Sequence, residues 1–270
     1  MDTDTSHLLA TSATSEACSN QIKWRRGNAK LNDNTYHISI PAGWSCKPWA
    51  TECYAHASPM DGKITDGEHQ TFRCYAATME SIYPQHRKSL WNNWKALLYH
   101  IHEPHKLYNL MLHSLSCEAL CYKLSTGHMP KVRMFGTSGD FWHENMYLAT
   151  LALATKLSCL KFYWYTKAIP LWIKHADKVP PNVEQNASLG GRYDNLIYEN
   201  DLKYAKVVYS FEEANRLGLP IDKRDELASE PGGPFAIPLH GVQPKGSAAS
   251  KALQQLKKKG FHGYSKRKAS

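Results

Sequence analysis

The sequence has few cysteines, no long apolar run and, over residues 231–270, no acidic side chain at all. Seven cysteines in 270 residues are too few and too irregularly placed for a disulfide scaffold. The most apolar stretch, residues 146–165, is broken by Thr150, Thr155, Lys156 and Lys161, and it falls short of the ~18 apolar residues of a membrane span. We therefore expect no membrane segment.

No segment near the start of the sequence looks like a signal peptide. Residues 1–22 are rich in Ser, Thr, Ala and Asp without a continuous apolar core, which predicts a disordered N-terminal tail. We expect a cytoplasmic protein. In a reducing compartment, clustered cysteines bind metal or take part in catalysis more often than they form disulfides.

Positive charge is concentrated at the C-terminal end. Of 33 Lys and Arg residues, eight lie in residues 231–270, which leaves 25 against 24 acidic residues in the remainder of the chain. Residues 257–270 are thus expected to form a basic tail. Such a tail can bind nucleic acid through its phosphates, or it can be a solvated terminus that aids solubility.

Three cysteines follow the first predicted strand. Residues 35–40 alternate and are β-branched, and Pro41 to Gly43 end the strand before a loop over residues 44–75. This loop carries a C-x6-C-x20-C spacing formed by Cys46, Cys53 and Cys74. Thiolates suit iron-sulfur clusters, zinc and cuprous copper. Three thiolates on a 4Fe-4S cluster would leave one iron open to an exogenous ligand, whereas most clusters are held by four.

Zinc is an alternative for the same loop. His56 or His69 could complete a Cys3His site with the three cysteines. Structural zinc sites usually pair their ligands at C-x2 to C-x4 spacing, and neither spacing here fits. An iron-sulfur cluster, a zinc site and no metal remain three open interpretations.

From residue 131 onward, predicted strands alternate with helices. Five strands are predicted, at residues 131–135, 160–165, 182–188, 204–209 and 235–239. With residues 35–40 they make six mostly parallel strands in one α/β domain over residues 23–256. The alternation predicts a TIM-like partial (β/α)6 barrel, with extra helices inserted after the first strand.

The inserted helices contain a second cysteine pair. Cys117 and Cys121 share a helical stripe with Leu120 and Leu124. A C-x3-C pair can bind metal, but free cysteine on an apolar stripe more often packs in the core. We expect core packing for this pair.

Polar clusters follow the predicted strands, where parallel α/β folds place their sites. Ser138, Gly139 and Asp140 after the second strand suit a ligand with an amine or hydroxyl groups, and they equally suit a tight turn with Asp140 near a helix N-cap.

The later strands end in further candidates. Lys167 could contact a carboxylate or phosphate, or extend into solvent. Asn186 and Ser188, with the glycines of S-L-G-G-R, suit a polar ligand or an ordinary turn. His240 is a candidate acid/base or a structural histidine.

Several runs resemble the gene product 88 domain family of phages and mobile elements. They cover about residues 24–256 and include S-I-P-A-G-W-S-C, E-C-Y-A, F-R-C-Y-A, Y-P-Q-H-R-K-S-L-W-N-N-W, S-G-D-F, F-Y-W-Y-T-K, A-S-L-G-G-R, G-L-P-I-D and L-H-G-V-Q-P-K-G-S. This resemblance implies a shared fold without naming a reaction.

The order of motifs is also similar, more distantly, to radical S-adenosylmethionine enzymes. That resemblance implies a 4Fe-4S cluster on Cys46, Cys53 and Cys74 and an S-adenosylmethionine site that includes Gly139 and Asp140, with Ser188 and Asn186 as further contacts. The compact C-x3-C-x2-C signature of that superfamily is absent, because a long insertion precedes Cys74.

Two functions follow as expectations. The first is an iron-sulfur enzyme of unknown substrate, in which Lys167 and His240 are the catalytic candidates. The second is a non-enzymatic nucleic-acid-binding protein with a structural zinc, whose basic tail supplies affinity and whose Trp24, Trp44 and Trp49 offer stacking surfaces. An inactive barrel that serves as a binding scaffold is a third possibility.

Overall fold

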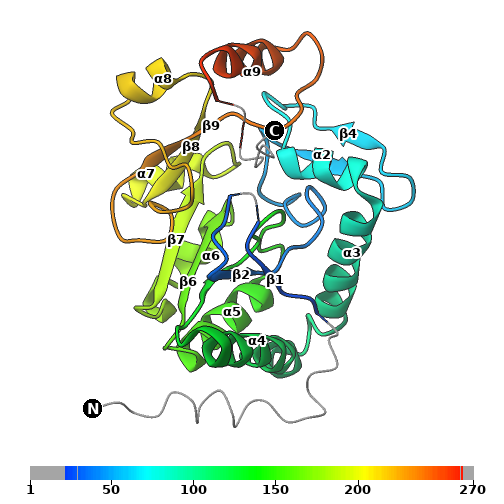
Figure 1. Ribbon diagram of the computed structural model, residues 1–270, viewed down its shortest axis with the longest axis vertical. Helices are drawn as coiled ribbons and strands as arrows, with labels where there is room; N and C mark the ends of the chain where they lie inside the picture. Colours follow the sequence, from blue (N-terminus) through cyan, green and yellow to red (C-terminus); the bar gives the residue numbers. More distant parts are fainter. Residues whose placement is uncertain (1–21, 29, 262, 264–270) are drawn as a thin grey trace.

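The computed structural model describes residues 22–28, 30–261 and 263 (Figure 1). Residues 1–21 of the expected N-terminal tail, and most of residues 262–270, lie outside the described residues. Ile22, the last residue assigned to that tail, is 1% exposed and belongs to the main core. The folded domain therefore includes Ile22.

A seven-stranded sheet forms the centre of the molecule. Its strands, in spatial order, are β1 (Arg25–Arg26), β2 (Thr35–His37), β5 (Lys131–Arg133), β6 (Lys161–Thr166), β7 (Val183–Ser188), β8 (Tyr204–Val208) and β9 (Phe235–Pro238). The short β1 is antiparallel to β2, and every later pairing is parallel. No described pairing joins β9 to β1 or β2, so the sheet does not close on itself.

Helices connect the parallel strands, as the alternation predicts. They are α2 (Tyr75–Ile82), α3 (Pro84–Tyr99), α4 (Pro104–Thr126), α5 (Glu144–Lys156), α6 (Ile169–Lys174), α7 (Asp194–Glu199), α8 (Phe211–Arg216) and α9 (Ala248–Lys258). The first three are the helices expected between the first two predicted strands. Figure 1 shows α4 and α5 together at one end of the molecule and α9 at the other.

The two faces of the sheet have different roles. Successive side chains of a strand point to opposite faces. Val132 and Trp164 point to one face and pack in the main core with residues of α4 and α5, such as Leu115 and Tyr147. Alternate side chains such as Arg133 and Tyr165 point to the other face, where they line a cavity.

The cysteine loop contains a β-hairpin that the sequence did not predict. Strand β3 (Ala55–Ala57) pairs antiparallel with β4 (Ile64–Asp66), and α2 packs beside β3. Each strand has only three residues, too few for an alternating pattern to be recognised. Figure 1 shows this hairpin and α2 at the upper right, across from the ends of β8 and β9.

Helix α9 changes the predicted boundary of the basic tail. The boundary at residue 257 cuts through this helix, which ends at Lys258. Ser247 caps its N-terminus, and Leu253 and Leu256 are buried. The first two tail lysines therefore belong to a folded helix.

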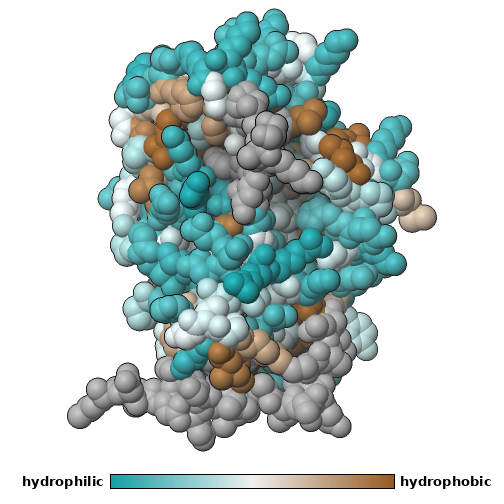
Figure 2. Space-filling view, in the orientation of Figure 1, coloured by the Kyte–Doolittle hydropathy of each residue, from teal (hydrophilic) through white to brown (hydrophobic). Residues whose placement is uncertain are grey.

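The surface in view is mostly hydrophilic, with apolar residues in small separate groups (Figure 2). Of the helices in the described part of the chain, none is both long enough and apolar enough to cross a bilayer.

Candidate functional site

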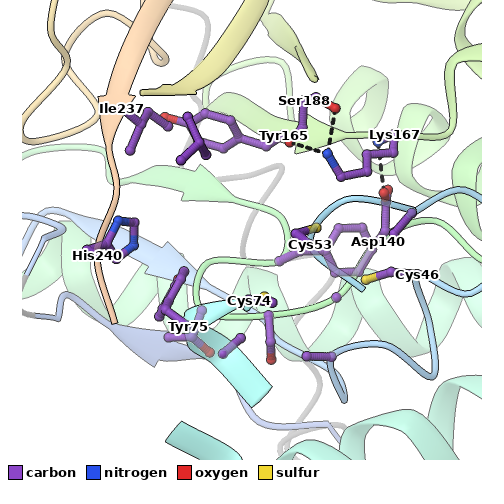
Figure 3. Close-up of a pocket in the computed structure, with 18 of the residues that line it drawn as sticks. Cys46, Cys53, Cys74, Tyr75, Asp140, Tyr165, Lys167, Ser188, Ile237 and His240 are labelled. Carbon is purple, nitrogen blue, oxygen red and sulfur yellow. Dashed lines mark hydrogen bonds between the residues drawn. The ribbon is translucent and has the colours of Figure 1, made fainter. Parts of the chain in front are cut away.

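A cavity with a volume of about 190 Å³ lies at the carboxyl ends of the parallel strands. Its walls are the cysteine loop on one side and the segments after β5, β6, β7 and β9 on the other. Figure 3 shows Cys46, Cys53 and Asp140 on one side of the space and His240 on the other, with Cys74 and Tyr75 next to each other below them. The cavity therefore combines groups from both halves of the chain.

The three predicted ligand cysteines, Cys46, Cys53 and Cys74, all line this cavity. All three thiols are free. Burial raises the pKa of Cys46 well above its ordinary value, and Asp140 and the other two cysteines add to the effect. Burial raises the pKa of Cys74 to about 12, with a further contribution from Cys53. The three thiols are thus close enough to interact electrostatically, and burial favours the protonated form of Cys46 and Cys74.

The hairpin explains how the long insertion still brings the cysteines together. Residues 54–73 leave Cys53, form β3 and β4, and return so that the Cys74 N–H donates to the Cys53 carbonyl oxygen at 3.3 Å. Cys74 is the N-cap of α2, and the N–H groups of Ala76 and Ala77 partly offset the rise in its pKa. A thiolate at this position would face the positive end of the helix.

The loop carries Cys46 into the cavity through a tight turn. The N–H groups of Trp49 and Ala50 donate to the Cys46 carbonyl oxygen at 2.9 Å. Ser45 is buried, donates its hydroxyl to the Pro41 carbonyl oxygen, and accepts from the Asp140 N–H at 3.3 Å. Ser45 thus fixes the cysteine loop against the turn after β5.

The lining of the cavity bears on the zinc and iron-sulfur interpretations of the three cysteines. Among the described residues, no three or more His, Cys, Asp or Glu side chains surround a common single-ion position. Sulfurs on one zinc would each lie ~2.3 Å from it, whereas cluster thiolates bind different irons and stand farther apart. His56 and His69 are not among the described residues that line the cavity. The expected Cys3His zinc site therefore lacks its histidine at this cavity.

Asp140 is held by protein groups on both carboxylate oxygens. Its Oδ1 accepts from the Thr166 hydroxyl at 2.6 Å and the Phe141 N–H at 2.8 Å, and its Oδ2 accepts from the Lys167 N–H at 2.8 Å. Burial raises its pKa, and these hydrogen bonds oppose the rise. Asp140 connects the end of β5 to the end of β6 while it stays beside Cys46.

Ser138 and Gly139 form the turn that places Asp140. The Ser138 hydroxyl donates to the Ile40 carbonyl oxygen at 2.7 Å. Gly139 has a φ of +110°, and a Cβ there would lie 2.3 Å from Ile40 Cγ1. Only glycine fits this turn without displacing its neighbour.

Lys167 and Ser188 line the cavity but bond to each other. The Lys167 ammonium donates to the Ser188 carbonyl and hydroxyl oxygens at 2.7 and 3.1 Å, and to the Leu189 carbonyl oxygen at 2.6 Å. Its three donors are thereby used. Asn186 is fully buried outside the cavity lining, and its amide donates to the carbonyl oxygens of Trp164 and Ala228. These residues hold the strand ends in place.

His240 lies on the far wall of the cavity. Its Nδ1 donates to the Pro238 carbonyl oxygen at 3.0 Å, and its ring packs 4.7 Å from the Tyr75 ring. Burial lowers its pKa to about 4, so the ring is neutral at pH 7. With Nδ1 as the donor, Nε2 keeps its lone pair.

Sequence reasoning missed several lining residues, chiefly Lys30, Tyr75, Arg133 and Tyr165. Arg133 and Tyr165 lie inside predicted strands, on the face opposite Val132 and Trp164. The sequence signal that could have found them is a polar side chain at these alternate strand positions. Tyr75 follows Cys74 directly, but nothing in the sequence shows which way its side chain points.

The other cysteine pair is not packed as expected. Cys121 is exposed, and Leu124 on the same stripe is 79% exposed. Cys117 is disulfide-bonded. The expected core packing of this stripe is therefore wrong at Cys121 and Leu124, because this face of α4 points away from the sheet.

The three tryptophans expected to stack on bases differ in their exposure. Trp24 is buried and donates to the Ser114 hydroxyl, so it offers no stacking surface. Trp49 is half-buried and donates to the Phe141 carbonyl oxygen. Trp44 is 41% exposed, and it lines an open groove with Lys47, Pro48, Trp94, Trp142 and Arg192.

The comparisons with known proteins give one positive result. The family described as gene product 88 matches residues 12–258, which is most of the chain. The chain matches no curated protein and no solved structure. On the extent of the family match, the chain belongs to the gene product 88 family.

Proposed function

We propose that this protein is an iron-sulfur enzyme whose cluster is held by Cys46, Cys53 and Cys74. The supporting observation is that three free thiols, separated by six and twenty residues, line one cavity at the carboxyl ends of parallel strands. Three thiolate ligands leave one iron of a 4Fe-4S cluster free for an exogenous ligand.

The order of the strands supports a TIM-like partial barrel. The six parallel strands follow one another in space as in sequence, from β2 to β9, which is the strand order of a (β/α) barrel. Such folds place their active sites at the carboxyl ends of the strands, where the cysteine cavity lies.

We further propose S-adenosylmethionine as the exogenous ligand, in a cytoplasmic setting. When bound, the cluster and this ligand would supply radical chemistry. The turn at Ser138 and Gly139 adjoins Cys46 through Ser45 and would contact the ligand with its backbone. Both carboxylate oxygens of Asp140 already accept hydrogen bonds, so its main role is to fix the turn.

Metal content of single cysteine variants tests the proposal. After anaerobic purification, we expect Cys46→Ala, Cys53→Ala and Cys74→Ala each to lose most of the iron and sulfide found in the wild-type protein. Cys159→Ala is the matched control, because Cys159 is also free and half-buried but packs beside the main core. Equal iron in the control and the three variants would reject the assignment.

A second candidate function is binding of single-stranded nucleic acid. The observation that favours it is the open groove that combines Trp44, Trp94 and Trp142 with Lys47 and Arg192. Aromatic side chains stack on bases, and cations follow the phosphates. We expect Trp44→Ala to weaken oligonucleotide binding by about fivefold or more, since stacking contributes ~1 to 3 kcal/mol per base. Tyr99→Ala is the control, because Tyr99 is exposed but does not line the groove. Equal oligonucleotide binding by both variants would show that the groove is not the binding site.

A further inference from the structure

We propose that the side of the cavity opposite Cys46 binds an anionic group, a carboxylate or a phosphate, at Arg133. If the proposed function holds, this group belongs to the substrate. The anion site itself depends only on residues of β5, β6 and the segments that cover them.

Cationic side chains dominate the ionisable lining of the cavity. Apart from the thiols, the tyrosines and neutral His240, the ionisable lining residues are Lys30, Arg73, Arg133, Lys167 and Asp140. Arg73 is paired with Asp66 outside the lining, and Lys167 is bonded to Ser188 and Leu189. The other two cations of the lining are Lys30 and Arg133.

Lys30 and Arg133 share one buried carboxylate. Asp225 accepts from the Lys30 ammonium at 2.6 Å, from the Arg133 guanidinium, and from the Tyr165 hydroxyl at 3.0 Å. Burial would raise the pKa of Asp225, but Arg133 and Lys30 hold it below its ordinary value. A second carboxylate, Asp222, acts on Lys30, but its oxygens accept from three backbone N–H groups.

Arg133 has hydrogen-bonding capacity left over. It is 8% exposed, and its Nη1 faces Asp225, but its Nε has no partner among the described residues. A buried guanidinium with an unused donor is costly, and it calls for a ligand or a bound water. The guanidinium also lies 4.8 Å from the Tyr165 ring, which holds it in place.

The surroundings of Arg133 suit an anion. Arg133 interacts electrostatically with Tyr75 and neutral His240 and lies over the Tyr165 ring, and Ile237 adds an apolar wall to the same cavity (Figure 3). None of these four side chains is a carboxylate. The planar guanidinium matches the geometry of carboxylates and phosphates, and partial burial strengthens such pairs. An anion here would lie across the cavity from Cys46.

Anion binding by two variants tests the site. Inorganic phosphate and acetate serve as separate probes, titrated calorimetrically into the full chain at constant ionic strength. We expect one of them to bind the wild-type protein, and Arg133→Gln to weaken that binding at least tenfold. Asp225→Asn also breaks the ion pair, but it frees the guanidinium, so we expect equal or tighter binding.

The two variants separate an anion site from a structural ion pair. If Asp225→Asn loses anion binding as fully as Arg133→Gln, or if neither probe binds the wild-type protein, the proposal is wrong. Should Arg133→Gln fail to fold, Arg133→Lys keeps the charge but loses the planar fork, and it should weaken binding severalfold. The titrations need no iron, so they succeed or fail independently of the cluster.

Discussion

Glu80 is a fully buried carboxyl group on α2, behind the cysteine loop. Its Oε1 accepts from the Ala42 N–H at 2.7 Å, and its Oε2 has no partner among the described residues. Burial raises its pKa to about 8, so the group is mostly protonated at pH 7. The folded state binds this proton more tightly than the unfolded state does, and its stability falls as the pH rises from 4.5 to 8.

Glu80→Gln should remove this dependence. Gln keeps the acceptor for Ala42 but does not ionise, so the variant should match the wild type near pH 4.5 and exceed it near pH 8. The difference should grow by up to ~1.4 kcal/mol per pH unit. Urea unfolding across this range measures it. Exposed Glu226→Gln is the control, and parallel profiles for the wild type and Glu80→Gln would contradict the prediction.

Single residues show what the sequence could predict about the site. Cysteine and glycine could be recognised from the sequence because few other residues can bind a metal as a thiolate or adopt a positive φ. Cys46, Cys53 and Cys74 do line one cavity. Lys167 lines it too, but its ammonium is used in holding the strand ends. Residue type and strand position cannot reveal such hydrogen bonds, because they depend on neighbours more than twenty residues away.

At the scale of elements, the C-terminus of α4 gives a direct test. Gly127 caps this helix with a φ of +75°, and a Cβ there would contact no described atom within 4 Å. Gly127→Ala should therefore destabilise the protein by about 1 kcal/mol through backbone strain alone. Gly232→Ala is the matched control, since that Cβ also has open space and φ is not positive. Thermal unfolding of both variants measures the two changes in stability. Equal changes for Gly127→Ala and Gly232→Ala would show that backbone strain at residue 127 does not destabilise the protein.

The elements with strong periodicity were predicted well. All six predicted parallel strands and the longer helices are present, because their apolar spacing reflects burial that the fold requires. The short elements β1, β3, β4 and α7 were missed, since two to six residues carry too little pattern. The hairpin β3–β4 matters most, because it makes the unusual cysteine spacing compatible with one cavity.

At the scale of the whole molecule, three buried or half-buried histidines set the response to acid. Burial lowers the pKa of His37, His86 and His240 to about 4. The unfolded chain binds these protons near pH 6.5, so the stability that neutral histidines contribute is lost as the pH falls from 6.5 to 4.

His37→Gln should reduce this loss of stability at acid pH. His37 is 1% exposed, and its Nε2 has no partner among the described residues, so it resists protonation. We expect the variant to lose less stability than the wild type between pH 6.5 and 4, by up to a few kcal/mol. Chemical denaturation at several pH values measures the difference, with exposed His128→Gln as the control. If His37→Gln loses as much stability as the wild type between pH 6.5 and 4, His37 does not contribute to the acid response.

The most direct test of the central claim is the iron and acid-labile sulfide content of the full chain, isolated without oxygen. Three converging thiolates around a 4Fe-4S cluster predict a brown protein with about four irons and four sulfides per chain. A colourless protein that carries about one zinc, or no metal after reconstitution with iron and sulfide, would contradict the account.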